Sequence, residues 1–383
     1  MIPMQDAVII GAGLAGCSLA IRLSAQGWKT VLIDRQYFPR HKPCGEFLSP
    51  EARETLASLG VAEAVERMEP NPIHRARLVL RHGQVLEAAL PGTGWGISRY
   101  TLDAGLHRAA REAGVEIRDA TTVTSIHARE DGDGYIVGTR TGGLSDTLEA
   151  RTVIAAWGCH RRPDLIDYEE MGQDGHAYIG IKTHMTGLAG TEAVELYLVP
   201  GGYIGIAPVE AGTYNVAALL RRDRLKGAGV KMKELLDFAA SGNPLLARRL
   251  AEGTPTDGTM ISTAPVYLSR RPQPWRMIPH AGDACAMIPP LFGDGMSAAL
   301  RSGILCASFA DRYLRGKLSM QDWERLYTEA VHREFSGILR KGRYLQAISG
   351  RPSAGRILSG FARLFPPVAD SLVKATRLKN TMS

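Results

Sequence analysis

The chain has 383 residues, a formal net charge of +7 and the composition of an ordinary globular protein. Because one hydrophobic core stops growing at roughly 250–300 residues, this length predicts two interlocked domains. Five scattered cysteines without metal-site spacing disfavour a disulfide scaffold or a zinc site and favour a reducing cytoplasm. The sequence shows no basic leader and no apolar run approaching about 20 residues, so we expect neither a signal peptide nor a transmembrane helix.

The first elements predict a dinucleotide-binding unit. In chain order they are an apolar strand at 7–10, the motif Gly11-x-Gly13-x-x-Gly16, a helix at 17–26, and a strand at 29–33 that ends at Asp34. Gly11 permits a tight turn, Gly13 admits a pyrophosphate at the helix N-terminus, and Gly16 lets helix and strand pack closely. Asp34 is placed to accept hydrogen bonds from a ribose. The motif alone leaves open whether the dinucleotide is FAD or a nicotinamide cofactor.

The next stretch, Lys42–Ala52, contains a thiol, a glycine and a carboxylate directly before a predicted helix. One interpretation is plain helix entry, with Ser49 as N-cap, Pro50 in the first turn and Gly60 as the C-terminal stop. The other is a loop that borders a bound cofactor. Both interpretations are compatible with the local sequence.

Apolar residues recur at helical spacing after Arg99. The Arg99 side chain can reach the cofactor's phosphates, or it can form a surface salt bridge instead. Residues 120–130 predict a strand whose backbone near Val123 can hold adenine, and 130–143 predict a hairpin. Residues 75–89 and 176–220 alternate apolar and polar side chains, as in an antiparallel sheet. We expect His184 and His280 to be strand residues and not bases.

Near residue 280, a short strand is followed by Gly282-Asp283, a proline-containing loop and a helix at 296–309 that starts after Gly293-x-Gly295. A buried carboxylate here can bind the ribityl hydroxyls of FAD. A nicotinamide cofactor has no ribityl chain. The helix N-terminus would favour negative charge on a reduced flavin. The alternative is an acidic turn before a glycine-rich helix start.

The tail from 338 to 383 carries nine basic residues against Asp370 alone, a balance of +8. It is compatible with weak contact to a membrane surface or with docking on its own domain. No nucleic-acid-binding motif accompanies this charge, so we expect no nucleic acid partner. The sequence does not indicate an oligomeric state, and we expect a small-molecule substrate.

With these motifs, the chain resembles the FAD-dependent superfamily of aromatic hydroxylases of the p-hydroxybenzoate hydroxylase type, flavin-dependent halogenases and geranylgeranyl reductases. The resemblance rests on GAGLAG with Asp34, SRYTLDAGL with Arg99, and AGDACAMIPPLFGDGM with Asp283. It implies an α/β fold in which an FAD-binding Rossmann-like domain of the GR2 type (1–72, 100–170, 265–335) is interleaved with an antiparallel β-sheet substrate domain (73–99, 171–264). A basic helical region at 336–383 would follow.

The resemblance also implies site residues. The segment KPCGEFLSP is similar to the Cys-Gly-x-x-x-Ser-Pro segment of geranylgeranyl reductases, which makes Cys44 and Glu46 the candidate catalytic residues. No metal is expected. The predicted FAD-contacting residues are Gly11, Gly13, Leu14, Ala15, Gly16, Asp34, Arg35, Cys44, Gly45, Phe47, Arg99, Val123, Gly282, Asp283, Pro290, Gly293, Gly295 and Met296.

Two activities follow from the resemblance. A monooxygenase would be reduced transiently by NAD(P)H and would hydroxylate a phenolic or polyketide-like substrate through a flavin C4a-hydroperoxide. A reductase or dehydrogenase would act on a carbon–carbon bond of an apolar substrate. The Pro289-Pro290 pair and the loss of reductase aromatics at Gly205 and Ala207 favour oxygenation, whereas Trp157 and the Cys44 loop favour reduction. Halogenation is not expected because the Trp-x-Trp-x-Ile-Pro motif is absent.

Overall fold

The computed structural model describes residues 4–81, 83–167, 176–225 and 231–349. The strands are β1 (Gln5–Ile10), β2 (Thr30–Ile33), β3 (Phe47–Leu48), β4 (Asn71–Val79), β5 (Val85–Gly96), β6 (Glu116–Arg118), β7 (Thr121–Ala128), β8 (Tyr135–Thr141), β9 (Leu144–Ala155), β10 (Ala177–Thr186), β11 (Ala193–Val199), β12 (Gly202–Pro208), β13 (Tyr214–Arg221), β14 (Thr254–Pro255), β15 (Ile261–Tyr267), β16 (Trp275–Arg276) and β17 (Ile278–Pro279). The α-helices are α1 (Leu14–Ala25), α2 (Ala52–Ser58), α3 (Ala62–Glu66), α4 (Arg99–Glu112), α5 (Met232–Ala240), α6 (Pro244–Ala251), α7 (Gly295–Leu314) and α8 (Met320–Ser349). Short 3-10 turns η1 (Glu210–Gly212), η2 (Arg222–Arg224), η3 (Gly282–Ala284) and η4 (Pro290–Phe292) complete the elements.

A six-stranded sheet holds the predicted nucleotide-binding unit, with strand order β6-β2-β1-β9-β8-β7. Strands β2, β1 and β9 run parallel, and β7, β8 and β9 form an antiparallel meander at the edge. The predicted strand, glycine turn, helix and strand are confirmed as β1, α1 and β2. The hairpin predicted at 130–143 covers only β8 and the turns on either side of it, and β8 pairs antiparallel with β7 before it and β9 after it.

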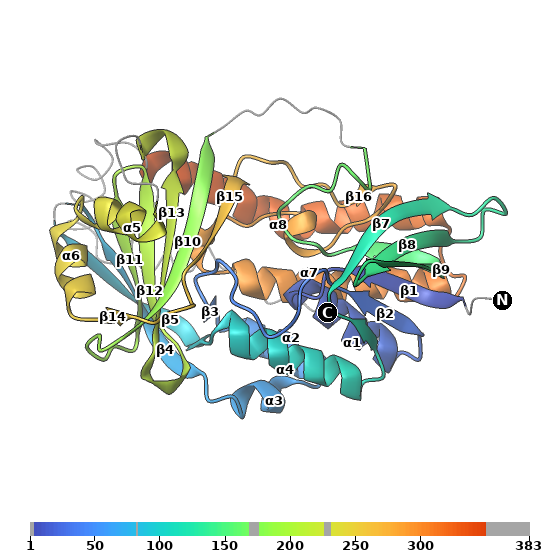
Figure 1. The fold of residues 1–383 in the computed structure, drawn as a ribbon, viewed down its shortest axis with the longest axis horizontal. Coiled ribbons are helices and arrows are strands. Elements are labelled where there is room, and N and C mark those ends of the chain that lie inside the picture. Colours follow the sequence, from blue (N-terminus) through green and yellow to red (C-terminus); the bar gives the residue numbers. More distant parts are fainter. Residues whose placement is uncertain (1–3, 82, 168–175, 226–230, 350–383) are drawn as a thin grey trace.

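Helices cover one face of this sheet. Helix α1 packs against α4 and α7, and α7 packs against α8 (Figure 1). The predicted apolar stripe of α4 is buried at Leu102, Leu106, Ala109 and Ala110. These helices share one continuous core with β1, because each turns its apolar side toward the sheet.

The second sheet has nine strands in the order β14-β10-β13-β12-β11-β4-β5-β3, with β15 beside β10. It lies at the opposite end of the molecule from the β1 unit (Figure 1). Helices α5 and α6 pack their apolar residues on its outer face, together with residues such as Ile181, Val216 and Ile206. The inner face is turned toward the loop before β3, and this arrangement positions the candidate site.

Several local expectations need correction. Ser49 does not cap α2: the helix begins at Ala52, and the Ser49 hydroxyl bonds to Ser297 at 2.7 Å while its carbonyl accepts from Ala52 N–H. Gly60, with φ +73°, does follow the end of α2 as predicted. The proposed boundary at residue 265 falls inside β15, which pairs with β10. Helix α8 includes 336–349, and the rest of the basic tail lies outside the described residues.

Candidate flavin site and active site

The glycine turn between β1 and α1 has the geometry that the motif requires. Gly11 has φ +109°, and a Cβ there would collide with the Ala156 carbonyl. A Cβ on Gly16 would collide with the Gly11 carbonyl, so helix and strand approach too closely for any side chain. Only glycine satisfies both positions, and the turn therefore leaves the α1 N-terminus open to an anion.

Two cationic side chains converge on Gly13. A Cβ built on Gly13 would lie 3.2 Å from Lys42 Nζ and 3.7 Å from an Arg99 guanidinium nitrogen. Both cations are anchored by Asp103, which accepts from Arg99 Nε at 2.8 Å and lies 3.3 Å from Lys42 Nζ. Arg99 does form a salt bridge, as the alternative held, but the bridge is not on the surface, because the Arg99 side chain is only 12% exposed and lies beside the glycine turn.

Asp103 is completely buried, and burial alone would raise the pKa of its carboxyl. Arg99 and Lys42 outweigh this effect and lower the pKa below its ordinary value. The carboxylate is therefore ionised at neutral pH, and the three groups carry a net charge of about +1 beside a helix N-terminus. This arrangement fits a pyrophosphate, which carries two negative charges.

Two acids predicted to bind the cofactor flank this cationic cluster. Asp34 accepts from the Ala12 amide at 3.0 Å and from the Gln36 amide at 3.0 Å, so it already secures the glycine turn. Asp283 borders open space, yet the surrounding protein desolvates its carboxyl and raises its pKa, against the opposing effect of Arg99 and Lys42. These residues fit FAD: Gly13 with Lys42 and Arg99 would hold its pyrophosphate, and Asp283 would accept hydrogen bonds from its ribityl hydroxyls.

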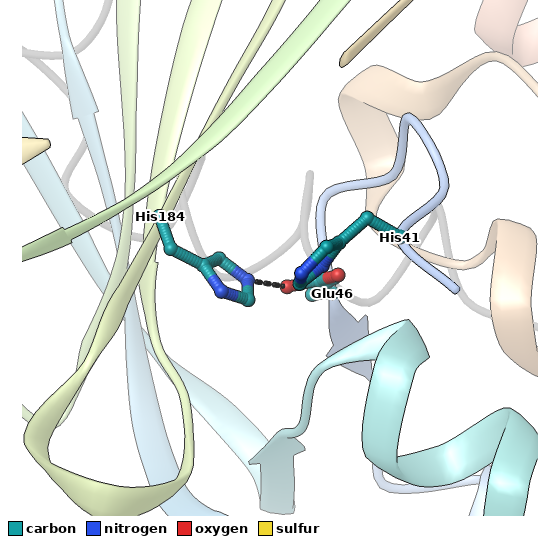
Figure 2. Close-up of side chains that lie close together, drawn as sticks. All are labelled: His41, Glu46 and His184. Carbon is teal, nitrogen blue, oxygen red and sulfur yellow. Dashed lines mark hydrogen bonds and ion pairs between the residues drawn. The ribbon is translucent and has the colours of Figure 1, made fainter. Parts of the chain in front are cut away.

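Glu46 lies at the centre of a buried polar cluster that joins the loop before β3 to strand β10. Its Oε2 accepts from His184 Nε2 at 2.6 Å, and its Oε1 lies 3.0 Å from Lys182 Nζ and accepts from the Arg99 amide at 3.0 Å. Figure 2 shows the His184 ring directed at one oxygen of the Glu46 carboxylate, and a ring nitrogen of His41 lies within 4.8 Å of a Glu46 carboxylate oxygen. Neither Glu46 nor Lys182 has any exposed surface. Glu46 thus holds the loop against the sheet.

The backbone at Glu46 supports the same role. Its φ of +54° lies in the left-handed region, which costs a non-glycine residue about 1–2 kcal/mol. The three contacts of the carboxylate and the bond from Ile97 N–H to the Glu46 carbonyl at 3.1 Å hold this conformation. With both carboxylate oxygens engaged and fully buried, Glu46, a candidate catalytic residue by its sequence, is a positioning residue in this geometry.

Burial lowers the pKa of Lys182, and the neighbouring Glu46 carboxylate opposes this shift. Burial, followed by Lys182 and His184, also lowers the pKa of His41, so His41 is neutral at neutral pH. Its Nδ1 lies 3.0 Å from Lys182 Nζ and accepts from that ammonium. His184 is a strand residue as expected, but it also bonds to Glu46.

His41, Glu46 and His184 offer metal-ligand atoms within 4.8 Å of one another. Lys182 Nζ lies 3.0 Å from both His41 Nδ1 and Glu46 Oε1. An ammonium ion so close to two of the three ligand atoms occupies the place of a metal cation and would repel one. The cluster is therefore an ion-pair network closed by lysine.

Cys44 lies two residues before Glu46 and is partly buried. Burial raises the pKa of its thiol, while the adjacent Arg99 guanidinium lowers it in part, so the thiol is protonated at neutral pH. The Cys44 carbonyl accepts from Asn215 Nδ2 of β13 at 2.9 Å. This bond fixes the loop over the inner face of the nine-stranded sheet.

The remaining predicted cofactor residues lie around the same region. Phe47 is buried in β3, and a Cβ on Gly293, which has φ +72°, would lie 2.7 Å from its ring. The Val123 carbonyl accepts from Arg162 at 2.9 Å. Leu14, Ala15, Gly282 and Met296 are buried, Arg35 and Gly45 are exposed, and Pro290 and Gly295 begin η4 and α7. Their contact with FAD stays a prediction.

The sequence analysis missed four residues of the site: His41, Asp103, Lys182 and Asn215. Asp103 stands four residues after Arg99, a helical pairing that the sequence does signal. Lys182 and Asn215 are buried polar residues of β10 and β13, and a polar residue within a buried strand indicates a paired or functional group. The partner of each lies far along the chain, which the sequence pattern does not reveal.

Comparisons with known proteins agree with this geometry. Residues 4–185 match the family model described as FAD binding domain. The menaquinone reductase of Mycobacterium tuberculosis is 24% identical over 400 residues, covering 98% of this chain and 89% of that protein. The digeranylgeranylglycerophospholipid reductase 1 of Methanothermobacter thermautotrophicus is 25% identical and covers 99% of this chain and 94% of its own. The solved structure of the flavin-dependent brominase Bmp2 superposes with a TM-score of 0.81 at 20% identity, covering 98% and 93% of the two chains.

The chain is therefore an FAD-dependent oxidoreductase, and residues 4–185 carry its FAD binding domain. The chain is similar to members of the superfamily that the sequence resembled, because its relatives and structural neighbours include flavin-dependent halogenases and geranylgeranyl reductase-like proteins. The predicted α/β fold of the GR2 type is confirmed. Within the described residues, no helix combines the length and the apolar character needed to cross a bilayer.

Proposed function

We propose that this chain is a reductase that uses bound FAD to saturate a carbon–carbon double bond of an apolar substrate. The observation that carries the proposal is the loop of Cys44 and Glu46, which the buried Lys182 and His184 lock against the substrate-facing sheet. Reduced FAD, when bound, supplies the hydride for such a reaction. The curated reductases that resemble the chain over 98–99% of its length support this direction.

In this proposal the Cys44 thiol donates the proton. Its raised pKa keeps it protonated before the reaction, and the Arg99 guanidinium beside it stabilises the thiolate left afterward. The carbon that receives no hydride takes the proton, and solvent then restores the thiol. Lys182 and His184 act through Glu46 and are positioning residues. A protonated thiol also resists oxidation, because the thiolate is the reactive form.

We propose that a nicotinamide donor of electrons binds in a pocket whose lining includes Trp157 and Gly158 after β9, Tyr267, Gln273 and Asp283. Arg161, Arg270 and Arg271 supply positive charge for phosphates, and the half-buried Trp157 ring supplies a stacking face. Because Asp283 also lines this pocket, a nicotinamide bound there would lie beside the flavin. We expect Arg271→Ala to raise KM for NADPH several-fold with little change in kcat.

A monooxygenase acting on a phenolic substrate is the second candidate. The observation that favours it is the small pair Gly205 and Ala207, which stands where reductases of the resembling type have bulky side chains. The Pro289-Pro290 pair before α7 points the same way. Oxygenation would require molecular oxygen as a co-substrate, and reduction would not.

The experiment that tests the proposal is anaerobic reoxidation of the reduced holoprotein. The flavin is reduced under argon, mixed with geranylgeraniol or 2-cyclohexen-1-one as probes, and followed by absorbance. We expect the oxidised flavin spectrum to return and a product with two additional hydrogens to form, and we expect Cys44→Ala to slow this step. Reoxidation that occurs only after oxygen is admitted, with any probe, would refute the reductase.

A further inference from the structure

The inner face of the nine-stranded sheet carries an ordered grid of side chains beneath the Cys44 loop. Residues directly opposite one another in paired strands share a face, so the register of β11, β12, β13 and β10 defines three rows. The first row is Val194, Ala207, Asn215 and His184, the second is Leu196, Gly205, Ala217 and Lys182, and the third is Leu198, Tyr203, Leu219 and Gly180. The Lys182 and His184 that hold Glu46 therefore stand at one edge of this grid.

The centre of the grid is a floor of small residues. Gly205 and Ala217 face each other in the middle row, and both are partly exposed although they lie in central strands. The opposite face of the same strands is packed by α5 and α6, so solvent reaches these residues from the side of the Cys44 loop. A Cβ on Gly205 would meet only ordinary contacts at 3.4 Å or more. A flat molecule can lie on this floor.

Two polar atoms beside the floor have no hydrogen-bond partner among the residues that the structure describes: the Tyr203 hydroxyl and Asn215 Oδ1. Tyr203 is only 5% exposed and packs among Tyr178, Leu219 and Val266. A buried polar group without a hydrogen-bond partner costs about 1–3 kcal/mol of folding free energy, so the Tyr203 hydroxyl does not stabilise the fold. A ligand oxygen on the floor would supply its missing partner.

Cys44 belongs to the same place. Asn215 uses its Nδ2 to hold the Cys44 carbonyl, and Asn215 stands in the row next to the floor. Burial raises the pKa of the Tyr203 phenol, and Tyr178 and Cys44 add to this shift, so Tyr203 keeps its proton as a donor. The Tyr203 hydroxyl and the Cys44 loop thus lie on the same face of the sheet as the floor.

We infer that the substrate's double bond is conjugated to a carbonyl group in a compact ring, and that the Tyr203 hydroxyl donates a hydrogen bond to that carbonyl oxygen. This inference rests on the proposed reductase function and names its substrate class. An isolated double bond of a flexible isoprenoid chain would leave the Tyr203 hydroxyl unmet.

The proposed reduction adds one hydride and one proton to the double bond. The β-carbon of the substrate would take up the hydride that bound FAD, once reduced by the nicotinamide donor, would supply, and the electron pair of the double bond would move toward the carbonyl. Negative charge on the oxygen is stabilised by the Tyr203 hydroxyl, and the α-carbon takes the proton of Cys44. Electrostatic donors of this kind act because charge on the oxygen develops during the reaction.

The test compares matched probes with the reduced holoprotein under argon. The ring probe 2-cyclohexen-1-one carries the conjugated carbonyl, cyclohexene lacks it, and geranylgeraniol is the isoprenoid probe. We expect reoxidation of the flavin and formation of cyclohexanone with the first probe and slower or no reaction with the other two. Reduction of geranylgeraniol but not of 2-cyclohexen-1-one would overturn the inference and leave the proposed reductase standing. If none of the three probes reoxidised the flavin under argon, and a probe were oxygenated in air, both the inference and the proposed reductase would be overturned.

Tyr203→Phe separates this role from packing. Loss of a donor to a developing oxyanion typically lowers the rate by about 100-fold, so we expect a drop of that order for 2-cyclohexen-1-one. The thermal midpoint should stay equal or rise, because the lost hydroxyl has no partner in the protein. Tyr178→Phe, in the same apolar cluster, is the matched control and should keep the wild-type rate. Equal rates for Tyr203→Phe and wild type would overturn the inference.

Discussion

Replacing Lys182 by methionine probes the ion pair that holds the Cys44 loop against the sheet. Lys182 Nζ lies 3.0 Å from Glu46 Oε1, and neither side chain is exposed. At that distance, an effective dielectric constant of about 20 gives an attraction of about 5 kcal/mol. Because the His184 ring and the Arg99 amide would still donate to Glu46, we expect the lower end of the range for broken buried pairs, about 3 kcal/mol.

For a chain of 383 residues, a loss of this size corresponds to a fall of about 4 °C in the thermal midpoint. The assay is thermal and urea unfolding followed by circular dichroism. The double variant Glu46→Gln with Lys182→Met leaves no unpaired charge and should be more stable than Lys182→Met alone. Lys233→Met removes the exposed partner of Asp237 and should cause no measurable change. A Lys182→Met midpoint equal to the wild type would refute the reasoning.

Three further predictions follow from individual sites. Burial lowers the pKa of His280 to about 4, so as the pH falls below about 6.5 the unfolded chain takes up a proton at this histidine before the folded chain does. The free energy of unfolding should therefore drop by about 2 kcal/mol between about pH 8 and pH 5. His280→Leu should remove this part of the drop, whereas the control His127→Leu, at an exposed site, should not. Lys42→Met should weaken FAD binding by roughly 10- to 100-fold in titrations of the apoprotein, whereas the exposed Lys29→Met should leave it unchanged; equal affinities would contradict a phosphate at Gly13. Lys182→Ala should allow binding of Zn²⁺ by the His41, Glu46 and His184 set in calorimetry, which the wild type should not show; no gain in zinc affinity would contradict the view that the ammonium fills a cation position.

Local spacing predicts those parts of the fold that local backbone geometry determines. The strand, Gly11-x-Gly13-x-x-Gly16 turn, helix and strand were found as predicted, because close packing and a positive φ leave no alternative to glycine. The stripe of α4 and the strand alternation of β10 to β13 also follow from the period of their buried side chains. Ser49 was misassigned because its hydroxyl bonds to Ser297 of α7, a tertiary contact that replaces the expected cap.

The roles of the candidate catalytic residues depend on contacts with residues that lie far away in the sequence. Sequence reasoning selected Cys44 and Glu46, but it did not find that Lys182 and His184 engage both oxygens of the Glu46 carboxylate. Because of these contacts, Glu46, which the sequence indicated as a candidate catalytic residue, acts as a positioning residue. Likewise, the role inferred for the Tyr203 hydroxyl depends on the strand register, which places Tyr203 beside Gly205 and Ala217. Such pairings between distant strands carry no signal in a single sequence.

The measurement that tests the central claim most directly is the isotopic composition of the product. The holoprotein is supplied with NADPH and 2-cyclohexen-1-one, once under argon and once under ¹⁸O₂, and the products are analysed by mass spectrometry. The account predicts cyclohexanone in both reactions, with two added hydrogens and no ¹⁸O. A product that forms only under ¹⁸O₂ and contains the label would contradict it and identify the enzyme as an oxygenase.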